Sequence, residues 1–277
     1  WYKIYEPFIR KAAGFGVASI KHDKDRYEHK YEYCDLLVTG SGPAGLASAY
    51  AAAKNGAKVI LAEDKSRFGG SLLTSEVSIG NQTGKEWAEN ILAELQEMPN
   101  VKVKNRSQVF GYYDHNMMVM SERISDHLSK SNKYMPRQRL WYIRAKEVVI
   151  SSGSIERPLV FGNNDTPGVM LSSAAKEYLK VYGVLVGKKP IVFTNNDSGY
   201  ETAIEFKKNG IDPLVLDTRE DLDSEIIKEA KNLNIKIKFS HVVIAAKGYK
   251  KVKSAEISEI SKDKKNLGSI KNIKCDC

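Results

Sequence analysis

The sequence contains few cysteines, few prolines and no long uninterrupted apolar segment. Its 277 residues include 3 cysteines, at positions 34, 275 and 277, which cannot form an even framework of disulfides. The most apolar stretch, residues 35–62, is interrupted by Lys54 and Lys58, and it falls short of the roughly 18 apolar residues that a membrane-spanning helix needs. These features exclude a disulfide-stabilised miniprotein and a membrane span. With no signal peptide at its start, the sequence predicts a cytoplasmic protein.

Stripes of arginine interleaved with aromatic residues, which mark many nucleic-acid-binding surfaces, are also absent. The net charge is +9, from 43 basic and 34 acidic residues, and residues 247–277 hold nine lysines against four acidic residues. Five of the nine net charges therefore lie in this last part of the chain. Scattered lysines are typical of a solvated surface. We predict no nucleic-acid partner.

One part of the sequence has the order of a strand, a glycine turn, a helix and a second strand. Residues 36–38 form a short continuous apolar run, as expected for a strand that is buried on both faces of a parallel sheet. A turn at 40–45, an Ala-rich helix at 46–54 and an apolar strand at 57–62 follow. This order defines a βαβ unit of about 30 residues.

The turn contains Gly40-x-Gly42-x-x-Gly45, a pattern that binds the diphosphate of a dinucleotide when it links a strand to a helix. The helix N-terminus then presents free N–H groups to the phosphates. Glu63 follows the second strand, where its carboxylate can accept both ribose hydroxyls and would repel a 2′-phosphate. We therefore expect NAD or FAD rather than NADP.

Two later segments, Gly69-Gly70 and Ser151-Ser152-Gly153, resemble those that approach the dinucleotide in flavoproteins with two dinucleotide-binding domains. No catalytic residue and no metal ligand is assigned. The residues expected to contact the cofactor are Gly40, Ser41, Gly42, Pro43, Ala44, Gly45, Glu63, Asp64, Gly69, Gly70, Ser71, Val109, Ser152 and Gly153.

The sequence thus predicts an α/β fold: a doubly wound parallel, Rossmann-like sheet with a small antiparallel β insertion and a second, inserted Rossmann-like domain. We expect an N-terminal helix and linker over 1–34 and a dinucleotide-binding domain over 35–187. The period of two within about 101–145 indicates the insertion. The second domain covers 188–277 and is expected to be truncated at its C-terminal end, as part of a longer chain.

The second domain carries Thr194-Asn195-Asn196-Asp197-Ser198-Gly199 where a working nucleotide domain carries glycines. Side chains there would crowd a diphosphate, so we expect altered or lost binding, with Asp217 and Arg219 at the surface or in an interface. The dispersed histidines do not support a metal site, and the absence of a Cys-x-x-Cys pair excludes thiol–disulfide reduction. His115, in an expected turn, is interpreted as an exposed residue rather than a general base.

Several strings resemble the alpha subunit of heterotetrameric sarcosine oxidase over nearly the whole chain. They occupy residues 35–47, 110–116, 156–161, 164–170 and 193–197, and the most particular are Tyr-Tyr-Asp-His-Asn and Asn-Asp-Thr-Pro-Gly-Val-Met. The resemblance implies an enzyme that demethylates sarcosine oxidatively, passing electrons to oxygen and the one-carbon unit to tetrahydrofolate.

The same resemblance implies that NAD is held by the glycine-motif domain, whereas FAD and FMN belong to a beta subunit or its interface with alpha. It also implies gamma and delta subunits, and amine oxidation on the beta subunit. Two alternatives remain open from the residues themselves. One is a self-contained FAD-dependent NADH oxidoreductase, and the other is a non-catalytic module for subunit assembly.

Overall fold

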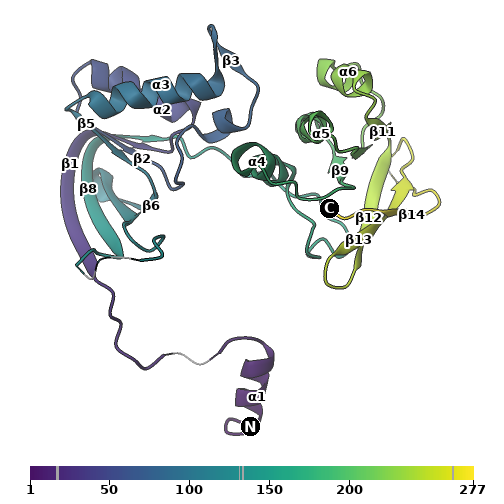
Figure 1. Ribbon diagram of the computed structural model, residues 1–277, viewed down its shortest axis with the longest axis horizontal. Helices are drawn as coiled ribbons and strands as arrows, with labels where there is room; N and C mark the ends of the chain where they lie inside the picture. Colours follow the sequence, from purple (N-terminus) through teal and green to yellow (C-terminus); the bar gives the residue numbers. More distant parts are fainter. Residues whose placement is uncertain (17–18, 131, 133, 264) are drawn as a thin grey trace.

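The computed structural model describes residues 1–16, 19–130, 132, 134–263 and 265–277. Two lobes are joined by an extended segment, and helix α1 (Tyr5–Ala12) is set apart from both (Figure 1). We call residues 27–150 the first lobe and residues 172–277 the second lobe. Within the described residues, no helix is long and apolar enough to cross a membrane.

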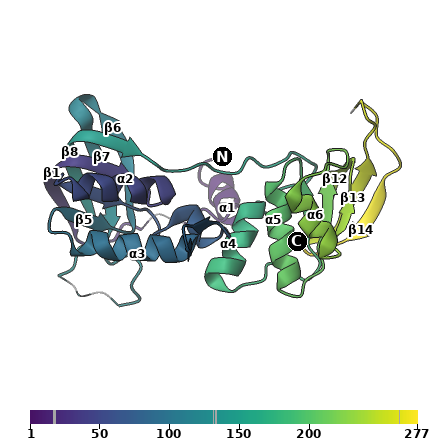
Figure 2. The same cartoon turned by 90° about the horizontal axis from the view of Figure 1, so that it is seen from above.

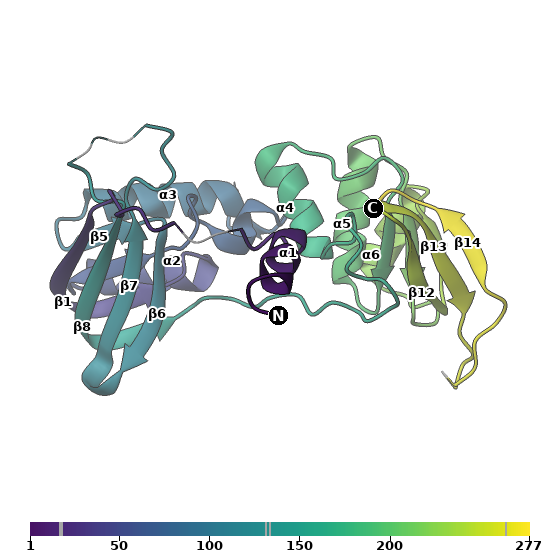
Figure 3. The same cartoon turned by 90° about the horizontal axis from the view of Figure 1, so that it is seen from below.

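The first lobe is built on one six-stranded sheet. Its strands are β1 (Tyr27–Thr39), β2 (Val59–Ala62), β5 (Val101–Lys104), β6 (Ser107–Tyr113), β7 (Met117–Arg123) and β8 (Gln138–Ile150). They lie in the order β5-β2-β1-β8-β7-β6, the first four parallel and the last two antiparallel to their neighbours. Figure 3 shows β1, β8, β7 and β6 side by side. The carboxyl ends of β1, β2 and β8 therefore meet at one edge of the sheet.

Helices cover one face of this sheet. Helices α2 (Pro43–Lys54) and α3 (Gly84–Glu97) lie side by side there (Figure 1) and enclose a core that includes Leu46 and Leu95. On the other face, Leu37 of β1 packs with Met120 of β7 and other residues of the antiparallel strands. The predicted α/β fold is confirmed, but strands rather than helices cover the second face of this lobe.

Two strands differ from the sequence prediction. Strand β1 begins at Tyr27, inside the segment expected to be a linker, because it pairs with β8 along its whole length. Strand β5, expected within the antiparallel insertion, pairs in parallel with β2. Alternating Val101 and Lys102 fit a half-buried strand of either direction, and burial of Val101 against the helices fixes it in the main sheet.

Glu32 links β1 to the residue before β2 and to β5. Its carboxylate accepts hydrogen bonds from the ammonium groups of Lys58, at 2.9 Å, and Lys102. Burial alone would raise the pKa of Glu32, but the hydrogen bonds from Lys102 and Lys58 outweigh it and lower the pKa to about 2. The charged form of Glu32 therefore stabilises this part of the sheet.

The second lobe repeats the alternation of strands and helices. Its parallel strands lie in the order β11-β10-β9, and three further strands form an antiparallel sheet (Figure 2). The elements are α4 (Ser172–Tyr182), β9 (Ile191–Thr194), α5 (Ser198–Lys208), β10 (Leu214–Asp217), α6 (Glu225–Asn232), β11 (Lys236–Lys238), β12 (His241–Gly248), β13 (Val252–Glu259) and β14 (Lys271–Lys274).

Short elements complete the fold. They are the 3₁₀ turns η1 (Gly70–Leu73) and η2 (Asp114–Asn116), and the hairpin strands β3 (Ser78–Ile79) and β4 (Gln82–Thr83). Helix α4 precedes the expected domain boundary at 187, yet its Ala175 packs into the core of the second lobe. The domain boundaries themselves stay a prediction.

Candidate functional site: a glycine turn at the edge of the first sheet

The three glycines of the turn after β1 differ in what requires them. Gly40 has φ +93°, and a Cβ there would lie 2.4 Å from the carbonyl oxygen of Ser151. A Cβ on Gly45 would lie 1.9 Å from the carbonyl oxygen of Gly40. Gly42 has an ordinary φ of −68°, and a Cβ there would meet no atom within 4 Å. Packing therefore requires Gly40 and Gly45, whereas Gly42 leaves open space beside the backbone.

This open space lies at the N-terminus of α2. Gly42 is the N-cap residue and offers no side-chain cap, and Pro43 occupies the first helical position. The first N–H groups of a helix have no partner within it, and they carry the positive end of the helix dipole. Pro43 and Ala44 are exposed. The turn thus presents backbone donors to an anion that approaches over Gly42.

Glu63, which directly follows β2, is fixed against this turn. Its Oε2 accepts hydrogen bonds from the backbone N–H of Ser41, at 2.9 Å, and from the Ser41 hydroxyl, at 2.5 Å. Its Oε1 accepts from the N–H of Lys65 at 3.0 Å. Glu63 is 7% exposed and Ser41 is fully buried, so the carboxylate is held in one orientation at the turn.

A second glycine turn closes against the first. Gly69 has φ +118° and Gly70 has φ +54°, a region that glycine adopts without strain. The N–H of Gly69 donates to the carbonyl oxygen of Ser41 at 3.0 Å. A Cβ on Gly70 would lie 2.8 Å from Cα of Gly42, so the two backbones touch. Ser71 continues into η1.

The other predicted residues are less tightly joined to the turn. Ser152 is exposed and borders Gly40, and Gly153 is exposed with φ +70° and open space around it. The Asp64 side chain is exposed, while its carbonyl oxygen accepts a hydrogen bond from Arg123. Val109 is half-buried in β6 and packs into the core between the strands. The structure thus gathers the glycines, Ser41, Glu63 and the end of β8, but it shows no side-chain role for Val109 or Asp64.

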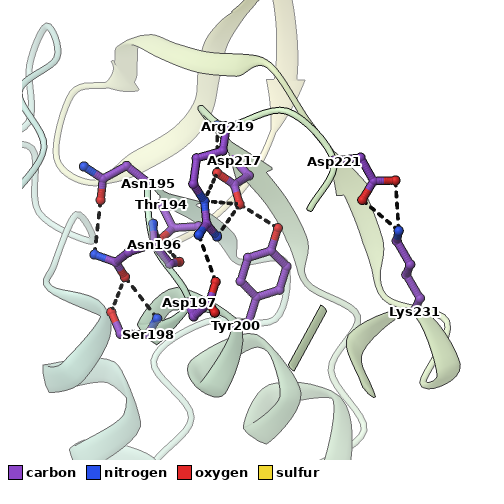
Figure 4. A network of polar contacts seen from close by, with 10 residues as sticks. All are labelled: Thr194, Asn195, Asn196, Asp197, Ser198, Tyr200, Asp217, Arg219, Asp221 and Lys231. Atoms are coloured by element: carbon purple, nitrogen blue, oxygen red, sulfur yellow. Dashed lines mark hydrogen bonds and ion pairs between the residues drawn. The ribbon is translucent and has the colours of Figure 1, made fainter. Parts of the chain in front are cut away.

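The corresponding turn in the second lobe, between β9 and α5, packs against a network of polar side chains. The buried carboxylate of Asp217 accepts hydrogen bonds from the Tyr200 hydroxyl, at 2.8 Å, and from the Arg219 guanidinium, at 2.8 Å (Figure 4). Arg219 also pairs with Asp197 at 2.9 Å. The expected surface position of Asp217 is wrong, because the residue is fully buried within this network. The sequence signal for this network is Arg219, a cation two residues after Asp217 that can pair with it.

The pKa values in this network follow from burial and charge. Burial, followed by the hydrogen bond to Asp217, raises the pKa of Tyr200 well above its usual range. The carboxylate of Asp217 also raises the pKa of Arg219. The acid at the end of β10 is thus occupied by its own neighbours.

A cavity of about 1060 Å³ lies between the second lobe and the segment that joins the lobes, from which residues 156–161 line it. Its lining includes much of β9 and the start of α5. Asn196 Oδ1 accepts from the N–H and hydroxyl of Ser198, the first residue of α5, at 3.0 and 2.6 Å. Because this side chain occupies a backbone donor at the helix N-terminus, we do not place a nucleotide diphosphate there.

The described residues show no arrangement that supports a metal site, a histidine general base or a reactive cysteine. Among the described residues, no group of three or more His, Cys, Asp and Glu side chains could hold a metal ion. His115 lies in η2 with φ +59°, exposed at the turn. Cys34 is a buried thiol, and burial raises its pKa to about 12. A thiol with so high a pKa is a poor nucleophile.

The chain is similar in sequence to a family of oxidoreductases and to sarcosine oxidase subunits. Residues 35–132 match the family model described as FAD dependent oxidoreductase. The sarcosine oxidase subunit alpha of Rhizobium meliloti (strain 1021) is 45% identical over 220 residues, covering 79% of this chain and 22% of that protein. The subunit of the same name from Corynebacterium sp. (strain P-1) is 34% identical over 267 residues, covering 95% and 27%. The chain spans about a quarter of the length of these curated relatives.

Solved structures share the fold at low sequence identity. L-proline dehydrogenase from P. horikoshii has a TM-score of 0.62 and 21% identity, covering 94% of this chain and 43% of that chain. Thioredoxin reductase from T. acidophilum has a TM-score of 0.63 and 17% identity, covering 88% and 75%. These likenesses show that the chain shares its Rossmann-like α/β fold with these enzymes.

The sequence relatives point to a narrower group of proteins than the shared fold does. This chain is homologous to a segment of the sarcosine oxidase alpha subunits, over most of its own length. The resemblance seen in the sequence strings is thereby confirmed.

Proposed function

We propose that this chain is the NAD-binding portion of the alpha subunit of a sarcosine oxidase or a related secondary-amine oxidase. The main support is the clear space beside Gly42 at the N-terminus of α2, where a Cβ would meet no atom of the described residues within 4 Å. Free helix donors border that space, and the fixed carboxylate of Glu63 lies at the same edge of the sheet. A dinucleotide needs this combination, because its diphosphate is anionic and its ribose donates hydroxyl groups.

In this proposal the chain binds and orients the nucleotide and contributes no catalytic residue. The amides at the start of α2 hold the diphosphate, and Glu63 accepts a ribose hydroxyl. NAD has a structural or regulatory role here rather than that of a hydride donor in turnover. Oxidation of the amine belongs to the FAD of a beta subunit, with FMN at the interface, and gamma and delta subunits complete the enzyme.

FAD in the same turn is a second candidate, favoured by the match of residues 35–132 to the FAD dependent oxidoreductase family. It would make the chain a flavin-dependent NADH oxidoreductase. The same backbone donors and the same carboxylate would hold its adenosine diphosphate half. The two candidates therefore differ in the rest of the ligand and in its absorption.

The purified chain distinguishes the two candidates. An absorption spectrum with flavin bands after purification would favour FAD, and a colourless chain that binds added NAD in titration calorimetry would favour NAD. We expect NAD to bind more tightly than NADP because the Glu63 carboxylate repels a 2′-phosphate. Glu63→Ala should weaken NAD binding by about 1.5–3 kcal/mol, the contribution of one hydrogen bond to this charge. Glu89→Ala, which removes an exposed acid from α3, is the matched control.

Two results of these measurements would contradict the proposal. If neither NAD nor FAD binds, the proposed function is wrong and the assembly module is the better explanation. If Glu63→Ala leaves NAD affinity unchanged, the ribose assignment is wrong.

A further inference from the structure

The Ser41 side chain joins three segments of the candidate site. Its hydroxyl donates to Glu63 Oε2 at 2.5 Å and accepts from the N–H of Gly69 at 3.2 Å. Ser41 belongs to the first glycine turn, Glu63 follows β2, and Gly69 begins the second glycine turn. The hydroxyl is fully buried, so water does not compete for these bonds.

The donors to Glu63 determine how much of its carboxylate remains for a ligand. A carboxylate has about four lone-pair sites, two on each oxygen. Ser41 fills both sites on Oε2 through its N–H and hydroxyl, and the Lys65 N–H fills one site on Oε1. Within the part of the chain that the structure describes, these donors leave one acceptor site, on Oε1.

We propose that Ser41 is a positioning residue that holds Glu63 so that Oε1 accepts a hydroxyl of the adenosine ribose. This inference rests on the proposed function, since it assigns a role within the same nucleotide site. Ser41 does not touch the ribose in this scheme. It acts by fixing the carboxylate before the nucleotide arrives, which lowers the entropic cost of binding.

A purely structural role for the hydroxyl would leave a different signature. The Gly69 N–H also bonds the Ser41 carbonyl oxygen at 3.0 Å, and the Ser41 N–H bonds Glu63 at 2.9 Å. Both backbone bonds survive replacement of Ser41 by alanine. The two turns therefore stay connected in Ser41→Ala, whereas the carboxylate loses the bond that completes its orientation.

The test combines a protein change with a ligand change. NAD and an NAD analogue whose adenosine carries 2′,3′-dideoxyribose are titrated calorimetrically into the 277-residue chain and its Ser41→Ala variant. We expect Ser41→Ala to weaken NAD roughly tenfold to thirtyfold, the effect of one hydrogen bond to a charged group at the low end of its range. The analogue, which has no hydroxyls for Glu63, should bind both proteins equally.

Controls separate the possible results. Ser48→Ala removes a hydroxyl within α2, which donates to the Ala44 carbonyl oxygen at 2.8 Å, and should change neither affinity. If Ser41→Ala does not fold, Ser41→Cys, which keeps a weaker donor at this position, is measured in its place. Equal weakening of NAD and analogue, or no weakening of either, overturns the positioning role. A wild-type chain that binds neither ligand refutes the proposed function instead, and this inference with it.

Discussion

Two glycines of one turn should respond in opposite ways to the same substitution. We predict that Gly42→Ala keeps the protein stable but impairs nucleotide binding, and that Gly45→Ala destabilises the protein. The physical reason is the surroundings of the added methyl group. At Gly42 it meets no atom of the chain within 4 Å, whereas at Gly45 it lies 1.9 Å from the carbonyl oxygen of Gly40.

The magnitudes follow from these distances. For Gly42→Ala, the smaller entropy of the unfolded chain contributes about 0.4–1 kcal/mol, and alanine is a poorer N-cap than glycine by a similar amount. The net change in the free energy of unfolding should stay within about 1 kcal/mol. For Gly45→Ala, overpacking against backbone costs about 3 kcal/mol or more, and the better helix propensity of alanine offsets about 1 kcal/mol. A net loss of about 2 kcal/mol or more is expected.

Urea unfolding followed by circular dichroism measures the first quantity, and titration calorimetry with NAD measures the second. The methyl group of Gly42→Ala should weaken NAD binding by about tenfold or more, because it occupies the space assigned to the diphosphate. Full affinity in that variant would refute the placement of the phosphates. A Gly45→Ala protein as stable as the wild type would refute the packing argument.

Three further predictions concern stability and reactivity. The pKa of Glu32 falls from 4.5 to about 2 on folding, so its contribution to the free energy of unfolding is complete above pH 4.5 and is lost as the pH drops towards 2. Urea midpoints across this window should therefore fall less steeply in Glu32→Gln than in the wild type, and identical slopes would contradict this. Arg219→Ala removes the guanidinium from the buried Asp217 carboxylate and should cost about 3 kcal/mol in urea unfolding, part of which Asp217→Asn in the same chain should restore. Cys34, with a pKa of about 12, should react with iodoacetamide at pH 8 only after unfolding, as peptide mass spectrometry can show; rapid labelling of the folded chain would contradict its burial.

The sequence predicts those elements whose burial leaves a pattern in the chain. Strand β2 and helix α2 were identified because continuous apolar residues and an Ala-rich stretch flank the glycine turn. The first half of β1 was missed for the opposite reason. Residues 27–33 alternate aromatic and charged side chains that are mostly exposed, and their strand conformation comes from pairing with β8, more than a hundred residues away. Such long-range pairing leaves no local signal.

The candidate site shows the same division. The spacing from Gly40 predicts that Glu63 stands at the carboxyl edge of the sheet, because a βαβ unit brings the ends of both strands together. It does not predict that the Ser41 hydroxyl holds this carboxylate, since that depends on side-chain orientation within a buried turn. Likewise, the sequence of the second turn shows that two of the three glycines are replaced. It does not predict that Asp217 is buried, because this depends on Tyr200 and Arg219 converging on it.

Comparison of the two turns separates packing from ligand binding. Thr194, Asn196 and Gly199 in the second lobe stand at the positions of Gly40, Gly42 and Gly45. A Cβ on Gly199 would lie 2.6 Å from Cβ of Thr194, so the glycine that allows helix and strand to touch is retained. The glycine next to open space is replaced by Asn196, whose side-chain oxygen accepts a hydrogen bond from the N–H of Ser198 at the start of α5. Since a βαβ unit can keep its fold without a glycine there, we expect the glycine at position 42 to be needed for the proposed nucleotide rather than for the fold.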